Sequence, residues 1–111
     1  MAGKEAFLQA VQNGYNFKGE SIYLGGAILD GEPVAGAPVR LPMKTLNRHG
    51  LIAGATGTGK TKTLQLISEG LSSASIPVVL MDIKGDLSGI AAAGTANDKI
   101  KERCQKLSIE Y

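Results

Sequence analysis

Hydrophobic residues recur at helical spacing near both ends of the chain. Within residues 4–13 one face is apolar, and it consists of Phe7, Leu8 and Val11. Gly14 follows at the point where a helix would stop. Residues 98–107 show the same spacing after Asn97 or Asp98 as a cap, and their apolar face consists of Ile100, Cys104 and Leu107. We therefore expect a short amphipathic helix in each stretch.

Short apolar runs broken by glycine and proline occupy residues 21–46. The Asp30-Gly31 pair separates two of these runs and is a typical signal for a tight hairpin turn. Pro38 and Pro42 bound the run after the turn, and proline lacks the N–H group that a central strand needs. The pattern predicts a small β-hairpin whose second strand lies at an edge.

Two further apolar runs flank a stretch with helical spacing. Residues 51–53 and 78–82 are uninterrupted apolar segments, the second ending in Asp82, as is typical of strands buried on both faces of a parallel sheet. Between them, residues 59–72 carry an apolar stripe that consists of Leu64, Ile67 and Leu71. Strand, helix and strand in this order form a right-handed crossover. The prediction is an α/β fold with a parallel sheet, preceded by the N-terminal helix and the β-hairpin.

The candidate chemistry lies between the first of these strands and the helix. Residues 54–61 read Gly-Ala-Thr-Gly-Thr-Gly-Lys-Thr and match every fixed position of the phosphate-binding pattern G-x-x-x-x-G-K-[ST]. The glycines allow successive backbone N–H groups to point into one concavity, at a helix N-terminus whose dipole favours anions. Lys60 would reach the β and γ phosphates, and the Thr61 hydroxyl would bind Mg²⁺. The expected nucleotide-binding residues are Gly54, Ala55, Thr56, Gly57, Thr58, Gly59, Lys60, Thr61 and Lys62.

A glycine-rich turn between a strand and a helix can also be a plain connection. Here the three glycines, the Gly-Lys-Thr triplet and both flanks agree, which favours a site for ATP or ADP with Mg²⁺. Binding alone does not predict hydrolysis, because turnover needs further groups that position water and stabilise the transferring phosphoryl group.

Asp82 has two interpretations. At the carboxyl end of a parallel strand it would emerge beside the phosphate loop, where it would join Lys60 in catalysis by holding Mg²⁺ through water. It would equally serve as a strand-end residue that caps the next loop or contacts a neighbouring subunit. An acid at a strand end is a weak motif by itself, so both interpretations stay open.

Composition excludes several classes of protein. The 111 residues are 43% hydrophobic and 20% charged with a net charge of +2, so composition alone indicates neither a nucleic-acid-binding nor a membrane-binding surface. Cys104 is the sole cysteine, which excludes an internal disulfide and suits a reducing compartment. His49, the sole histidine, lacks further ligands at metal-binding spacing. Without an apolar run of ~20 residues or a signal peptide, we expect a cytoplasmic protein with no membrane partner.

Two stretches carry a resemblance beyond the general motif. HGLIAGATGTGKTKTLQ, which starts at His49, and VVLMDIKGDLSGIA, which starts at Val78, resemble the HerA/FtsK group of P-loop ATPases. They are most similar to the YjgR-type bacterial proteins described as HerA-like helicases. The loop sequence is shared across the wider group, and Met-Asp-Ile-Lys-Gly-Asp-Leu-Ser-Gly is the narrower marker.

The resemblance implies a RecA-like α/β ATPase core, usually hexameric, that couples ATP hydrolysis to movement along double-stranded DNA. Lys60 and Thr61 match the phosphate lysine and the Mg²⁺ ligand of that group. Asp82 matches an acid on the strand after the P-loop helix, not the Asp-Glu pair of a later strand, and the sequence contains no Asp-Glu. We expect the chain to be the N-terminal part of such an ATPase, with its parallel sheet incomplete and no turnover by these residues alone.

Taken together, the sequence predicts an N-terminal helix and β-hairpin segment at residues 1–47 and the first part of a P-loop ATPase domain at residues 48–111. The expected function is the ATP-binding segment of a HerA-like DNA translocase or helicase. The alternative is a nucleotide-binding module that senses ATP or ADP without hydrolysis. A continuation of the reading frame into an apolar run ending in Asp-Glu would favour the enzyme.

Overall fold

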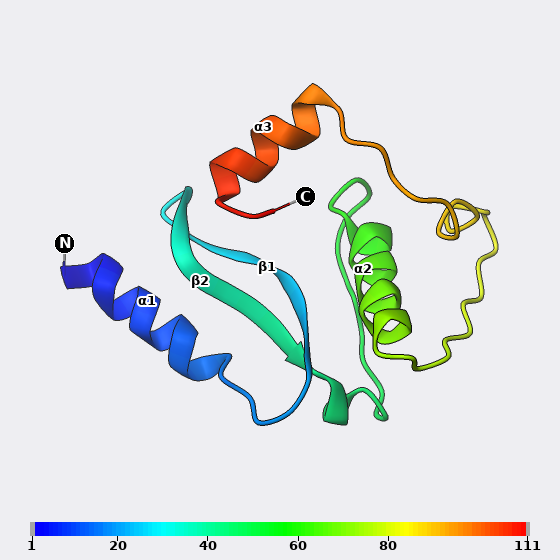
Figure 1. Ribbon diagram of the computed structural model, residues 1–111, viewed down its shortest axis with the longest axis horizontal. Helices are drawn as coiled ribbons and strands as arrows, with labels where there is room; N and C mark the ends of the chain where they lie inside the picture. Colours follow the sequence, from blue (N-terminus) through cyan, green and yellow to red (C-terminus); the bar gives the residue numbers. More distant parts are fainter. Residues whose placement is uncertain (1, 111) are drawn as a thin grey trace.

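The structure is a computed structural model that describes residues 2–110, and it is built around a two-stranded antiparallel hairpin (Figure 1). In chain order its elements are α1 (Ala2–Gly14), β1 (Ser21–Leu29), β2 (Glu32–Pro42), the 3-10 helix η1 (Met43–Thr45), α2 (Lys60–Ser73) and α3 (Asp98–Leu107). α1 and α3 contact β2, and α2 contacts β1. The hairpin therefore connects the three α-helices of the described chain.

The hairpin is closed by the turn that the sequence predicts. Asp30 and Gly31 have φ angles of 50° and 80°, the left-handed conformation that a two-residue type I′ turn requires at both positions. From this turn the strands pair antiparallel as far as Ser21 and Pro42, with register shifts within residues 23–28. In a two-stranded sheet each strand has a free edge, so the prolines of β2 are tolerated. The β-hairpin prediction is confirmed.

Close contacts seat α1 and α2 on the hairpin. Gln12 of α1 donates a hydrogen bond from Nε2 to the carbonyl oxygen of Gly36 in β2 at 2.9 Å. On α2, Gly70 approaches Ile22 of β1 so closely that a Cβ at position 70 would lie 2.8 Å from two Ile22 side-chain carbons. The absence of a side chain at Gly70 therefore sets how near the helix can come to the strand.

The buried core is small and centred on the hairpin. Ile22, Val34 and Ala37 are buried residues of β1 and β2, and Leu87 is the buried apolar residue of the chain after α2. Ser68 is buried on α2, where its hydroxyl donates to the carbonyl oxygen one turn earlier at 2.8 Å. The few buried residues of the described chain thus lie on the hairpin, on α2 and in the loop after it. The segments before and after α2 are largely exposed.

The predicted parallel sheet is not present in residues 2–110. Residues 51–53 and 78–82, predicted as buried strands, are extended without strand pairing and lie on the two sides of α2 in Figure 1. Leu51 and Val79 are each 90% exposed, and Met81 is 93% exposed. A parallel strand requires a neighbouring strand for its ladder, and here neither segment is paired with another strand. The α/β composition is confirmed, whereas the parallel arrangement of these two segments is corrected.

The helix predictions agree with the structure. α1 ends at Gly14, and α2 starts at Lys60 and ends at Ser73, each end within one residue of the expected range of 59–72. The Asn97 side chain caps α3 by accepting a hydrogen bond from the N–H of Ile100 at 2.9 Å. Within residues 2–110, no helix has the length and apolar character needed to cross a membrane.

Candidate nucleotide-binding site

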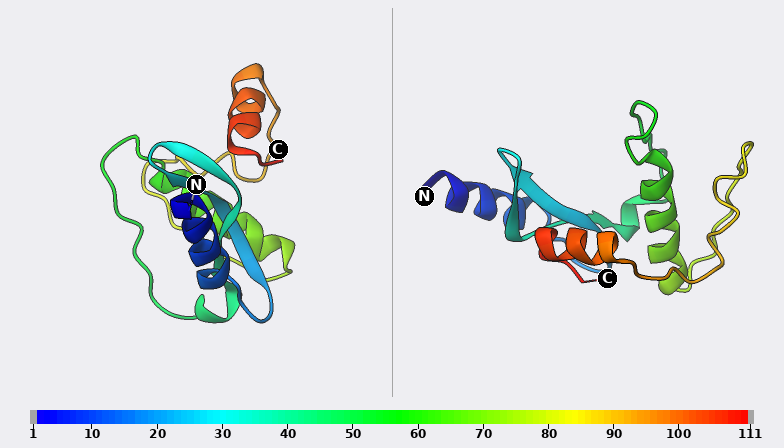
Figure 2. Two further views of the ribbon diagram at one scale, coloured as in Figure 1. Left: turned by 90° about the vertical axis from the view of Figure 1, so that its left-hand side faces the viewer. Right: turned by 90° about the horizontal axis from the view of Figure 1, so that it is seen from above.

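The predicted phosphate-binding residues form an exposed loop that leads directly into α2. Residues 54–59 project away from the hairpin, as the right-hand view of Figure 2 shows. Gly57 and Gly59 have φ angles of 79° and 95°, a conformation that costs glycine little and other residues more. Gly59 is the N-cap of α2, and no side chain caps the first turn. The N–H groups of that turn are therefore not occupied by a capping side chain.

Three donors converge on the carbonyl oxygen of Ala55. The Thr58 hydroxyl donates to it at 2.6 Å, the Lys60 ammonium at 2.8 Å and the Thr58 N–H at 3.3 Å. Lys60 is half-buried as a result, although the loop around it is exposed. The ammonium group is thus held against the loop that is expected to receive phosphate.

The remaining site residues lie in the first turn of α2. Thr61 is half-buried, and Lys62 is exposed. Thr63 donates to the carbonyl oxygen of Gly59 from its N–H at 3.0 Å and from its hydroxyl at 3.1 Å, which fixes the junction between loop and helix. The structure therefore brings the predicted nucleotide-binding residues together in one loop and one helix end.

Asp82 caps the loop that follows it. Its Oδ2 accepts a hydrogen bond from the N–H of Leu87 at 2.8 Å, and its Oδ1 accepts one from the N–H of Lys84 at 3.1 Å. These bonds, first that from Leu87 and then that from Lys84, hold the pKa of the Asp82 carboxyl below its ordinary value because they stabilise the charged form. The geometry supports the loop-capping interpretation, and a catalytic part for Asp82 stays a prediction.

The loop capped by Asp82 is attached to the N-terminal half of α2. Gln65 donates from Nε2 to the carbonyl oxygen of Asp86 at 3.5 Å, a long contact at the outer limit for a hydrogen bond. Gln65 lies about one and a half turns after Lys60, since a helix has 3.6 residues per turn. In Figure 1 this loop and the loop of residues 54–59 lie toward the same end of α2. The two loops therefore lie toward the same end of α2. The Asp82 carboxylate itself bonds to backbone amides of its own loop and not to residues 54–59.

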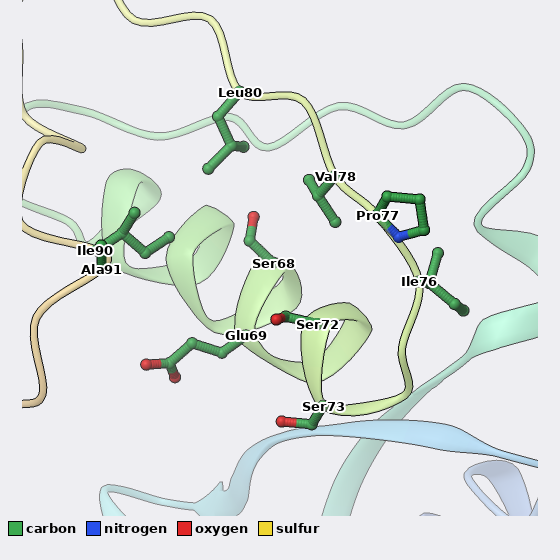
Figure 3. A pocket seen from close by; sticks show the side chains of 10 residues that line it. All are labelled: Ser68, Glu69, Ser72, Ser73, Ile76, Pro77, Val78, Leu80, Ile90 and Ala91. Atoms are coloured by element: carbon green, nitrogen blue, oxygen red, sulfur yellow. The ribbon is translucent and has the colours of Figure 1, made fainter.

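A groove along α2 was missed by the sequence analysis. It has a volume of about 500 Å³ and lies between α2 and the extended residues 76–80, with Ser68 and Ser72 on one side and Val78 and Leu80 on the other (Figure 3). Glu69 is the one charged residue of its lining, so the groove contains no group of titratable side chains suited to catalysis. The sequence held one weak signal for this groove. Ser68 and Ser72 lie about one turn apart in the predicted helix, so they are expected on the same face.

Replacing Asp82 by alanine is expected to loosen residues 83–88, because the amides of Leu87 and Lys84 lose their acceptor. In the native chain, the Asp82 bonds stabilise the loop fully above the ordinary aspartate pKa of about 3.9, and this contribution is lost as the pH falls through the lowered pKa. The Leu87 amide resonance, followed by NMR during acid titration, should shift with a midpoint below about 3.9. Asp86→Ala is the matched control, since its side chain makes neither bond; a midpoint at or above the ordinary value would refute the capping role.

Comparison with known proteins identifies a family for most of the chain. The family model described as "Helicase HerA-like C-terminal" matches residues 28–111. The match begins within β1 and extends through the loop of residues 54–59, α2 and α3. Neither the curated proteins nor the solved structures gave a match.

Proposed function

The chain belongs to the family of HerA-like helicase C-terminal domains, and from that premise we propose that residues 54–62 bind the phosphates of ATP or ADP. The observation that carries this proposal is the loop itself. It matches the phosphate-binding pattern at every fixed position, it is exposed, and it enters α2 at Gly59 with no capping side chain. An anion at this position would meet free backbone N–H groups and the positive end of the helix dipole.

The donor set also fits Mg²⁺ bound together with a nucleotide. Thr61 presents a hydroxyl oxygen in the first turn of α2, and Mg²⁺ prefers oxygen ligands supplied by a few side chains together with substrate phosphates. Among residues 2–110, no three His, Cys, Asp or Glu side chains are grouped to hold a metal alone. The metal would offset negative charge on the phosphates, while Lys60 supplies a second positive charge from the protein.

For the protein's activity we propose coupling of ATP hydrolysis to movement along double-stranded DNA by a homo-oligomer, a hexamer in the simplest case. The support for this step is the family match to helicase C-terminal domains, together with the phosphate-binding loop. Composition adds no support, because the net charge of +2 does not mark a nucleic-acid-binding surface.

A second candidate function is nucleotide sensing without hydrolysis. The observation that favours it is the state of Asp82, whose two carboxylate oxygens both accept hydrogen bonds from its own loop. A carboxylate engaged in this way must give up those bonds before it can hold water or metal-bound water for phosphoryl transfer. The proposed binding site is the same for both functions, and they differ in turnover.

Titration of the chain with a fluorescent ADP analogue in Mg²⁺ tests the proposal directly. Saturable binding that unlabelled ATP and ADP reverse, but adenosine does not, is expected because the site is built for phosphates. Phosphate release from ATP is then measured with and without duplex DNA. Turnover would support the translocase and contradict the sensor, whereas binding without turnover is expected of these residues under both candidates. Absence of binding by a chain that circular dichroism shows to be folded would contradict both.

A further inference from the structure

The carbonyl oxygen of Ala55 accepts hydrogen bonds from two side chains, those of Lys60 and Thr58. The Lys60 ammonium reaches it at 2.8 Å, and the Thr58 hydroxyl reaches it at 2.6 Å. A carbonyl oxygen offers two lone pairs, so these two side-chain donors already match its accepting capacity, and the Thr58 N–H at 3.3 Å is a weaker addition. When one of the two side-chain bonds is lost, the other is therefore the main bond that remains on this oxygen.

The loop is shaped to admit the Thr58 hydroxyl. A Cβ at position 54 would lie 2.5 Å from Thr58 Oγ1, which is closer than two unbonded atoms can approach. Glycine at position 54 is thus required by the space that this hydroxyl takes, because Gly54 is not among the glycines with a positive φ angle. No comparable obstruction is found at Gly57 or Gly59, where a Cβ would meet nothing within 4 Å.

We propose that Thr58 is a positioning residue that holds the Ala55 carbonyl when Lys60 transfers from this resting acceptor to a nucleotide phosphate. This inference rests on the proposed function, because the transfer requires a phosphate in the loop. Lys60 can leave Ala55 at little cost if another strong donor stays on the oxygen, whereas a carbonyl left without its partners loses hydrogen-bond energy. The Thr58 hydroxyl is the donor that stays.

The structure provides the two features that such an exchange requires. Lys60 carries three N–H donors on a flexible stem, so its ammonium can change acceptors without a change in the backbone. Thr58 is β-branched and its hydroxyl bonds within its own loop, so its donor remains in place during the exchange. The Ala55 carbonyl oxygen therefore keeps the Thr58 bond while the Lys60 ammonium moves from it to the phosphate.

A double-mutant cycle on nucleotide binding tests this role. Thr58→Val removes the hydroxyl and keeps the shape of the side chain, and it should weaken binding of the fluorescent ADP analogue about 3- to 10-fold, the range for one hydrogen bond. Thr58→Ser restores the hydroxyl and should bind within about 2-fold of the native chain. In a Lys60→Met background, where no ammonium is exchanged, Thr58→Val should have almost no further effect.

The outcomes separate this inference from the proposed function. Binding by the native chain with an equal loss for Thr58→Val in both Lys60 backgrounds would indicate a role limited to loop structure and would overturn the inference. Unchanged binding by Thr58→Val would overturn it as well, with the binding site itself intact. Absence of binding by the folded native chain would refute the proposed function and, with it, the exchange. Circular dichroism of each variant keeps a folding defect from being taken for a binding defect.

Discussion

Replacement of Lys60 by alanine should weaken the proposed nucleotide binding by about 10- to 100-fold, the largest effect that we expect on binding. The magnitude is that of a hydrogen bond to a charged group, about 1.5–3 kcal/mol. The Lys60 ammonium already lies against the loop of residues 54–59, 2.8 Å from the Ala55 carbonyl oxygen. Its removal takes away the positive charge closest to the expected position of the phosphates. An equilibrium titration with the fluorescent ADP analogue in Mg²⁺ measures the loss.

Lys99→Ala is the matched control for that experiment. Lys99 lies on α3, it is exposed, and its replacement changes the net charge by the same amount as Lys60→Ala. We expect binding by this variant to stay within about 2-fold of the native value, because Lys99 is exposed to solvent and belongs to another helix, where salt screens its charge. Equal losses in both variants would mean that binding depends on overall charge and that the loop is not the site.

Replacement of Gly70 by alanine should have the largest effect on stability. The new Cβ would lie 2.8 Å from two side-chain carbons of Ile22, which is only 4% exposed and has little room to move. Overpacking of this kind costs about 1–3 kcal/mol, and the better helix propensity of alanine returns up to ~1 kcal/mol. We expect a net loss of about 1–2 kcal/mol in the free energy of unfolding, measured by urea denaturation.

Gly3→Ala provides the control for helix propensity. Gly3 lies in α1, and a Cβ there would meet nothing within 4 Å. This substitution should leave stability unchanged or raise it by up to ~1 kcal/mol. If Gly70→Ala behaves in the same way as Gly3→Ala, then α2 does not pack on β1 as closely as described.

Local sequence signals were sufficient for the helices and for the hairpin. Gly14 ends α1, Asn97 caps α3 through the N–H of Ile100, and Asp30-Gly31 forms the left-handed turn. Each of these features depends on residues that are close in the sequence, so turn and capping preferences decide them. The glycine-rich loop belongs to the same class, because its glycines, its lysine and the helix start lie within nine residues, 54–62, while its binding of phosphate stays a prediction.

Long-range pairing could not be deduced in the same way. The apolar runs at residues 51–53 and 78–82 have the composition of buried strands, yet Leu51 and Val79 are 90% exposed. Whether such a run becomes a strand depends on which backbone lies beside it, and hydrophobicity does not specify the neighbour. The sequence also did not predict which groups bond to Asp82. Loop capping and catalysis use the same carboxylate, and they differ only in the groups that lie next to it.

The sequence by itself determined the start of α2 after the glycine-rich loop, the order of the three α-helices and the turn of the hairpin. These features follow from backbone preferences and side-chain spacing over a few residues, which act before distant segments meet. The tertiary structure alone decided that α2 packs on β1 through Gly70 and Ile22, that Asp82 caps its own loop, and that Thr58 and Lys60 share the Ala55 carbonyl. The physical reason is that a hydrogen bond or a packing contact forms only when two particular atoms come within about 3–4 Å of each other. Residue type and spacing in the sequence do not give that distance, and the folded backbone does.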